Sequence, residues 1–249
     1  MKLAEYLKYI ESFLKEYLEQ AHCKTYILGI SGGVDSSLCA ALARNAVGKD
    51  RLLCLIMPIA SHKADEEDAL ELVKQLDLNY VTVDGTEIFN SYVNTYKALG
   101  QDFDRSTLGN LKARIRMSIL YSFAQKYNGL VIGTDNADER YTGYFTKHGD
   151  GACDILPIAH LLKGEVVEAS KILGISDRLA ERVPTASLFE GQTDEGEMGI
   201  TYKDLDKYIM GGKVDEEVEK RILHLHKISE HKRVATPMPK NSIEVNNEG

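Results

Sequence analysis

The sequence predicts an α/β protein with a doubly wound, mainly parallel sheet and helices on both faces. Three observations support this fold class. Short β-favouring runs recur through the first half of the chain, segments of helical periodicity separate them, and a glycine-rich turn follows the first run. Strands that alternate with helices form parallel sheets, because each helix carries the chain back to the same edge.

Each element has its own signature. The first segment spaces its apolar residues by three or four positions and carries charges on its other face, as an amphipathic helix does. Acidic residues open the segment 64–76, where they suit the helix dipole. Strands are expected over 25–30, 51–57, 78–84 and 129–134. Helices are expected over 3–21, 38–47, 64–76, 87–99, 106–127 and 214–229, with polar loops around short elements over 134–204.

Length and composition indicate one globular unit. The chain has 249 residues, of which 43% are hydrophobic, with 20 glycines and 5 prolines, which excludes a disordered or low-complexity protein. No repeat, linker or shift in composition divides it, so a single domain is expected over 1–249. The polar tail NSIEVNNEG, 241–249, is expected to be frayed.

The charge balance limits the partners. Thirty basic and 38 acidic side chains give a net charge of −8, which disfavours nucleic acid and anionic membranes as partners. The longest apolar run, 52–60, is too short to span a bilayer, and the charged N-terminal segment does not have the core of a signal peptide. The four cysteines occur singly, which favours reduced thiols and a cytoplasmic location.

The segment GISGGVDSS, 29–37, has the properties of a phosphate-binding loop. It lies between the first predicted strand and the helix that follows, where parallel sheets bind ligands. Gly32 and Gly33 permit backbone angles that let successive amides converge on an anion. Asp35 is an oxygen ligand suited to Mg²⁺. The loop has neither the lysine of a Walker motif nor the spacing of a dinucleotide fingerprint.

This loop resembles that of the N-type ATP pyrophosphatases, which cleave ATP between the α and β phosphates. Further segments resemble the ammonia-dependent NAD synthetases of that superfamily along nearly the whole chain. They are GNLKARIRM (109–117), VIGTDNADE (131–139), TGYFTKHGDGACDILPI (142–158), ERVPTASL (181–188), DEGEMGITY (194–202) and EHKR (230–233). The resemblance implies an adenine nucleotide alpha hydrolase-like fold and a homodimer with substrate near the subunit interface.

The resemblance also implies a reaction. ATP would adenylate the carboxylate of deamido-NAD, and ammonia would attack the resulting anhydride, giving NAD, AMP and pyrophosphate in the last step of NAD biosynthesis. Because the chain is too short to include a glutaminase domain, the nitrogen donor is expected to be free ammonia. Such a site must position two reactants, neutralise the triphosphate and exclude water.

Particular residues acquire roles from the same resemblance. ATP would be bound by Gly29, Ile30, Ser31, Gly32, Gly33, Val34, Asp35, Ser36, Thr134, Lys163 and Thr185. Deamido-NAD would face Arg114, Lys147, Asp154, His231 and Lys232. Mg²⁺ would be held by Asp35 and Glu139, and Asp150 would be the catalytic group that orients ammonia.

Two arginines compete for one role. On a helical wheel, Arg116 falls within the apolar arc of the 106–127 helix and Arg114 lies outside it, so helix geometry favours Arg116 as the buried, functional charge. The resemblance instead assigns Arg114 to the substrate, which leaves Arg116 as an interface residue or a structural ion pair.

Two other functions and one dynamic property are also considered. A tRNA-modifying enzyme could use the same adenylating loop, but it would usually need a basic appended domain or reactive cysteines. A non-catalytic nucleotide-binding module would need the loop and have no use for Glu139, Lys147 or the EHKR segment. The loop segments 58–64 and 187–200 are expected to act as lids that are disordered without ligand.

Overall fold

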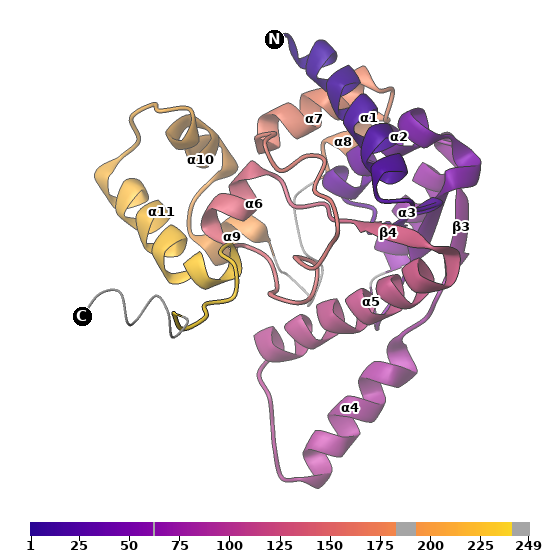
Figure 1. Ribbon diagram of the computed structural model, residues 1–249. Coiled ribbons are helices and arrows are strands. Elements are labelled where there is room, and N and C mark those ends of the chain that lie inside the picture. Colours follow the sequence, from indigo (N-terminus) through magenta and orange to yellow (C-terminus); the bar gives the residue numbers. More distant parts are fainter. Residues whose placement is uncertain (62, 183–192, 241–249) are drawn as a thin grey trace.

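Four parallel strands form the sheet of the part of the chain that the structure describes, which is residues 1–61, 63–182 and 193–240 of a computed structural model (Figure 1). The strand order is β3–β2–β1–β4. The chain therefore starts in the middle of the sheet and winds outward in both directions, which confirms the doubly wound prediction. The strands are β1 (Thr25–Gly29), β2 (Leu52–Ile56), β3 (Asn79–Thr82) and β4 (Gly129–Ile132).

One face of the sheet carries the larger core. Leu7, Leu14 and Leu18 of the first helix are buried there, together with Leu38 and Leu42 of the second. The leucine stripe of the first helix is thus part of the core. The helices that contribute to this core are α1 (Leu3–Gln20), α2 (Val34–Val47), α3 (Lys63–Gln75), α7 (Lys163–Ile172) and α8 (Asp177–Ala180).

The opposite face is covered mainly by α5 (Arg105–Tyr127), on which α4 (Thr86–Ala98) packs (Figure 1). Ala124 of α5 packs with Ile27 and Val131 of the sheet. The helix begins at a capped end, because the Asp104 carboxylate accepts a hydrogen bond from the Thr107 amide at 2.7 Å. None of the residues of α4, all of which are described, is buried.

A third group of helices lies beside the sheet (Figure 1). Its small core contains Met198, Tyr202, Leu205 and Ile222, and Tyr141 packs against it. The members are α6 (Ala137–Thr142), α9 (Asp194–Met198), α10 (Tyr202–Ile209) and α11 (Glu216–Ile228), and the two 3₁₀ turns of the described chain are η1 (Lys49–Arg51) and η2 (Glu230–Lys232).

Most predicted elements are present, with ends displaced by one or a few residues. The segment 134–204 is more helical than expected, since it contains the ten-residue α7. Parts of both predicted lids pack against the fold where they are described. Ile59 is fully buried, and 193–200 includes α9, whose Met198 is also buried. Residue 62, the rest of the second lid and the tail 241–249 lie outside the described residues. Among those that are described, no helix is both long and apolar enough to cross a membrane.

Candidate active site

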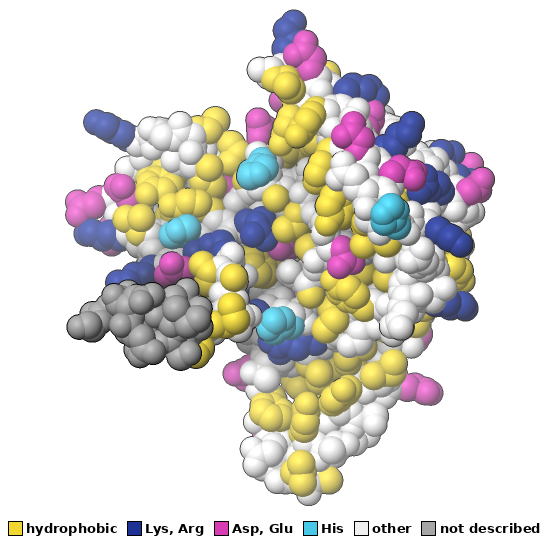
Figure 2. Space-filling model, viewed as in Figure 1, with side chains coloured by type: hydrophobic (Ala, Val, Ile, Leu, Met, Phe, Trp, Pro, Cys, Tyr) yellow, Lys and Arg dark blue, Asp and Glu magenta, His cyan; other side chains and the backbone are white. Residues whose placement is uncertain are grey.

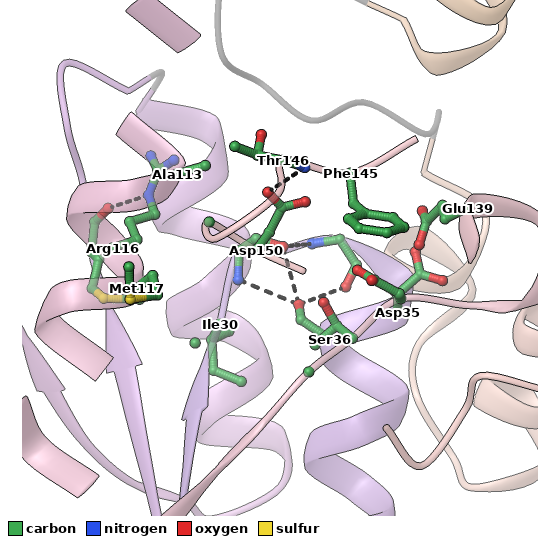
Figure 3. Close-up of a pocket in the computed structure, with 18 of the residues that line it drawn as sticks. Ile30, Asp35, Ser36, Ala113, Arg116, Met117, Glu139, Phe145, Thr146 and Asp150 are labelled. Atoms are coloured by element: carbon green, nitrogen blue, oxygen red, sulfur yellow. Dashed lines mark hydrogen bonds between the residues drawn. The ribbon is translucent and has the colours of Figure 1, made fainter. Parts of the chain in front are cut away.

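A cavity of about 540 Å³ opens at the carboxyl ends of the central strands. It extends from the loop after β1 to the segment after β4, so it lies at the point where the two halves of the sheet diverge. Figure 3 shows Arg116 and Met117 at one side of it and Asp35 and Glu139 at the other, with Asp150 between them. Lining residues that were assigned to a site from the sequence are Gly29, Ile30, Ser31, Gly33, Val34, Asp35, Ser36, Thr134, Glu139, Asp150, Lys163 and Lys232.

Hydroxyl groups hold the loop after β1 in shape. The Ser31 amide donates to Ser36 Oγ at 3.3 Å, and the Gly33 amide donates to Ser31 Oγ at 3.2 Å. Ser36 Oγ in turn donates to the Gly33 carbonyl at 3.0 Å. Gly32 has φ +81°, in the left-handed region that favours glycine. The loop leads directly into the N-terminus of α2, where backbone amides favour an anion.

Lys163 lies between two carboxylates. Its Nζ donates to Asp35 Oδ2 at 2.5 Å and lies 3.8 Å from Glu139 Oε1. Asn136 joins the same group, because its side-chain amide donates to Asp35 Oδ1 at 2.9 Å and its backbone amide donates to Glu139 Oε2 at 3.1 Å. Side chains from three distant parts of the sequence thus form one charged cluster in the cavity.

Charge and burial oppose each other in this cluster. Burial raises the pKa of Glu139 well above its ordinary value, and the nearby Asp35 carboxylate raises it further. Burial alone would lower the pKa of Lys163, but Asp35 and Glu139 outweigh it and leave this pKa raised. Two carboxylates held this close together suit a hard divalent cation. Because Mg²⁺ usually takes one or two carboxylates and completes its shell with phosphate and water, Asp35 and Glu139 fit that ion.

Lys163 is positioned by residues that sequence reasoning missed. It is the first residue of α7, and its backbone amide donates to Asp138 Oδ2 at 2.7 Å, while the next amide, of Gly164, donates to Asp206 Oδ2 at 3.0 Å. Burial, followed by the charge of Asp206, raises the pKa of Asp138 to about 8. The ammonium group also lies 4.9 Å from the centre of the Tyr202 ring. No sequence signal links these residues, since they come from three different helices.

Asp150 faces the cavity beside a second, unassigned carboxyl group. Its Oδ1 accepts a hydrogen bond from the Thr146 amide at 3.0 Å (Figure 3). Asp150 is exposed to the cavity, and the surrounding protein raises its pKa by displacing water from the carboxyl group. Asp135 is 3% exposed, and its Oδ2 has no hydrogen-bond partner among the described residues. Burial and the charge of Asp150 raise the pKa of Asp135 well above its ordinary value. This part of the cavity can therefore bind a cation or a proton donor.

Four of the five residues assigned to deamido-NAD lie close together. Lys147 Nζ donates to the His231 carbonyl at 2.8 Å, and Arg114 Nε donates to the Lys147 carbonyl at 3.4 Å. Lys232 follows His231 and turns into the cavity, where it donates to two backbone carbonyls. Arg114 is exposed and lies outside the cavity lining.

The remaining assigned residues lie elsewhere. Asp154 is next to β4, where its carboxylate accepts hydrogen bonds from the Val131 amide and the Tyr121 hydroxyl, and it is not part of the cavity lining. Gly32 does not line the cavity, and its carbonyl accepts a hydrogen bond from Arg182 at 3.3 Å. Thr185 lies outside the described residues.

Comparison with known proteins identifies the family of this chain. The NAD synthase family model matches residues 6–236. An NH3-dependent NAD+ synthetase of Mesoplasma florum is 46% identical over 240 residues, which is 96% of this chain and 98% of the relative. The chain belongs to the NAD synthase family. The recognition made from the loop and the segments that follow it is thereby confirmed.

Solved structures that are similar to this chain have the same fold. The NMN synthetase from Francisella tularensis matches with a TM-score of 0.91 and 36% identity, over 97% of this chain and 100% of that one. The NH3-dependent NAD synthetase from Campylobacter jejuni, solved in complex with a nitrate ion, matches with a TM-score of 0.80 and 28% identity, over 96% and 100% of the two chains.

Proposed function

We propose that this protein is an ammonia-dependent NAD synthetase. In this reaction ATP adenylates the carboxylate of deamido-NAD, and free ammonia converts the adenylate to the amide, giving NAD, AMP and pyrophosphate. The observation that carries the proposal is the cluster in which Lys163 joins Asp35 of the phosphate loop to Glu139. The relatives are named as NH3-dependent enzymes, and the chain matches them at 46% and 47% identity over 98% and 93% of their lengths. This similarity supports ammonia as the nitrogen donor.

The ATP end of the cavity follows from this cluster. Backbone amides of the loop and the ammonium of Lys163 would bind the phosphates, while Asp35 and Glu139 would hold Mg²⁺. When bound, the ion would neutralise charge on the phosphates as pyrophosphate leaves. Thr134 lines the same space and would contact ATP, as would Thr185.

The dinucleotide would bind at the other end. We assign Arg114, Lys147, His231 and Lys232 to its anionic groups, and Asp154 to its polar edge. Its carboxylate oxygen would attack the α-phosphorus, which displaces pyrophosphate and forms a mixed anhydride. Ammonia would then attack the acyl carbon, AMP would leave with the bonding electrons, and one N–H proton would be released. Asp150 is suited to orient ammonia because its carboxyl group faces the cavity.

The test is direct. The purified protein is incubated with ATP, Mg²⁺, ammonium and deamido-NAD, and NAD is measured with a coupled dehydrogenase. We expect NAD, with AMP and pyrophosphate in equal amounts. No NAD, or NAD only when glutamine and a partner protein are added, would refute the proposal.

A second candidate substrate comes from one comparison. The likeness to an NMN synthetase suggests that the acid precursor of that mononucleotide could be amidated by the same chemistry. Both acids should be compared at equal concentrations, by the ratio of their kcat/KM values. A ratio that favours the mononucleotide would replace deamido-NAD as the substrate and leave the reaction class unchanged.

The proposal includes a cytoplasmic homodimer. A dimer is supported by the apolar side chains that α4 and the loop after it expose, among them Ile88, Tyr92, Leu99 and Phe103. Hydrophobic side chains gather on that lobe in Figure 2. An exposed group of apolar side chains of this kind favours association. The free thiols of all four cysteines are compatible with a reducing compartment.

A further inference from the structure

Four cationic side chains line the described part of the cavity, and they differ in how their charge is compensated. Lys163 forms ion pairs with Asp35 and Glu139. Arg182 forms ion pairs with Asp65 and Asp68. The other two cations of the lining are Lys232 and Arg116, and neither lies within ion-pair distance of a described carboxylate.

Arg116 is held by neutral acceptors. Its Nε donates to the Met57 carbonyl at 3.0 Å, and its Nη2 donates to Ser61 Oγ at 3.3 Å. A guanidinium has five N–H donors, so these two hydrogen bonds leave three donors without an acceptor among the described residues. Burial lowers the pKa of Arg116, and the charges of Asp150 and Asp65 only partly oppose this effect without forming a hydrogen bond to it.

A partly buried guanidinium without a carboxylate is costly in an empty cavity. Such a charge is normally neutralised by a partner, and a planar fork with free donors matches the oxygens of a phosphate or a carboxylate. The neighbourhood adds positive charge, because Lys112 lies one turn earlier on α5 and its pKa is lowered by burial and by Arg116. This side of the cavity therefore attracts an anion.

We propose that Arg116 binds an oxyanion of a substrate, either a phosphate or a carboxylate group. The inference rests on the proposed function, which supplies two anionic substrates to one cavity. In Figure 3 Arg116 lies across the cavity from Asp35 and Glu139, so the oxyanion it binds lies on the opposite side from the candidate metal ligands. Arg116 is thus a cation of α5 that faces the cavity, whereas Arg114 lies on the outer side of the same helix.

A purely structural role would have a different signature. The two observed hydrogen bonds join α5 to the segment after β2. In the alternative, structural role, Arg116 would hold that segment in place and contact no substrate. In that case, removal of the side chain would lower thermal stability and weaken both substrates equally. If Arg116 instead contacts an oxyanion, removal of its side chain would weaken the binding of one substrate and not of the other.

The experiment compares wild type, Arg116→Ala, Arg116→Lys and the control Arg105→Ala. Arg105 is an exposed arginine on the same helix that does not line the cavity. Dissociation constants for MgATP and for deamido-NAD are measured separately by calorimetry, and Tm is measured for each variant. We expect Arg116→Ala to weaken one of the two ligands by at least about tenfold and Arg116→Lys to recover part of the loss.

The ligand that loses affinity identifies the source of the oxyanion. If Arg116→Ala is unstable, Arg116→Lys carries the test, since it keeps the charge and loses the fork. Both affinities within twofold of wild type, or an equal loss in both with a lowered Tm, would overturn the proposal. Failure of the proposed function is distinguishable, because it appears as absence of NAD synthesis by the wild type.

Discussion

At the scale of single residues, the site depends on positions where a single substitution would change the shape of the loop or the charge of the cavity. Gly32 and Lys163 are the clearest of these. Gly32 is pressed against α3, and a Cβ there would lie 2.8 Å from the Asp65 carbonyl oxygen. Lys163 has 6% of its side chain exposed and contacts both candidate metal ligands.

We expect Gly32→Ala to lower both Tm and ATP affinity, because the new methyl group would combine a left-handed backbone with a steric clash. Gly48→Ala is the matched control. Its φ of +80° is almost the same, and its ψ of 171° is also unfavourable for a residue other than glycine, but nothing lies within 4 Å of the added Cβ, so only a backbone cost of about 1–3 kcal/mol should remain. Equal losses of Tm in the two variants would contradict the steric argument.

Lys163→Ala should lower kcat/KM for ATP by about 10²-fold or more, because a preorganised cation at the phosphates is lost. NAD synthesis at varied ATP concentration measures it. Lys171→Ala is the control, since Lys171 is on the same helix and pairs with Glu181 away from the cavity. More than a tenth of wild-type kcat/KM in Lys163→Ala would be inconsistent with contact to the phosphates.

At the scale of elements, capping decides where the functional helices begin. The N-terminus of α5 is capped by Asp104, and hydrogen bonds from the Thr107 backbone and side chain lower the pKa of its carboxyl group below its ordinary 3.8. A carboxyl whose pKa is lower in the folded state stabilises the fold above its unfolded pKa. That stability is lost as the pH falls through the folded value.

We therefore expect Asp104→Ala to lower Tm at pH 7, and the difference from wild type to shrink as the pH falls below about 3.8. Asp104→Asn should keep the cap both at pH 7 and below a pH of about 3.8, since asparagine caps helices as well as aspartate does. Asp102→Ala, an exposed change two residues earlier, is the control. Thermal denaturation at a series of pH values measures all four proteins. A pH-independent deficit in Asp104→Ala would exclude the cap.

At the scale of the whole molecule, the sheet places the phosphate loop, the segment after β4 and α5 around one cavity, while α4 projects away from it. Ile88 and Tyr92 on α4 remain 45% and 46% exposed, and a second copy of the chain is the proposed partner for this surface.

Tyr92→Asp should shift the protein from dimer to monomer, measured by light scattering after size exclusion, because a charge would be buried in the apolar interface. Ile172→Asp is matched to it, since both side chains are 46% exposed and Ile172 lies on α7, away from α4. We expect that control to remain dimeric. A monomeric wild type would reject the dimer altogether.

The sequence alone determined the alternation of strands and helices, the phosphate loop and the family, because each depends on residues that are neighbours in the chain. TYILGI followed by SGGVDSS was sufficient for the strand, the turn and the helix start. Only the tertiary structure decided which charges meet. Lys163 and Asp35 are 128 residues apart, and Asn136 and Asp35 are 101 apart.

The two arginines of α5 show the same division. Helical periodicity placed Arg116 on the inward side, and the structure agrees. It did not indicate that Arg116 has no carboxylate partner, because this depends on the Met57 and Ser61 acceptors supplied by a distant loop. Local pattern fixes which way a side chain points along a helix. The packing of separate elements fixes what it meets, and so decides the chemistry of the cavity.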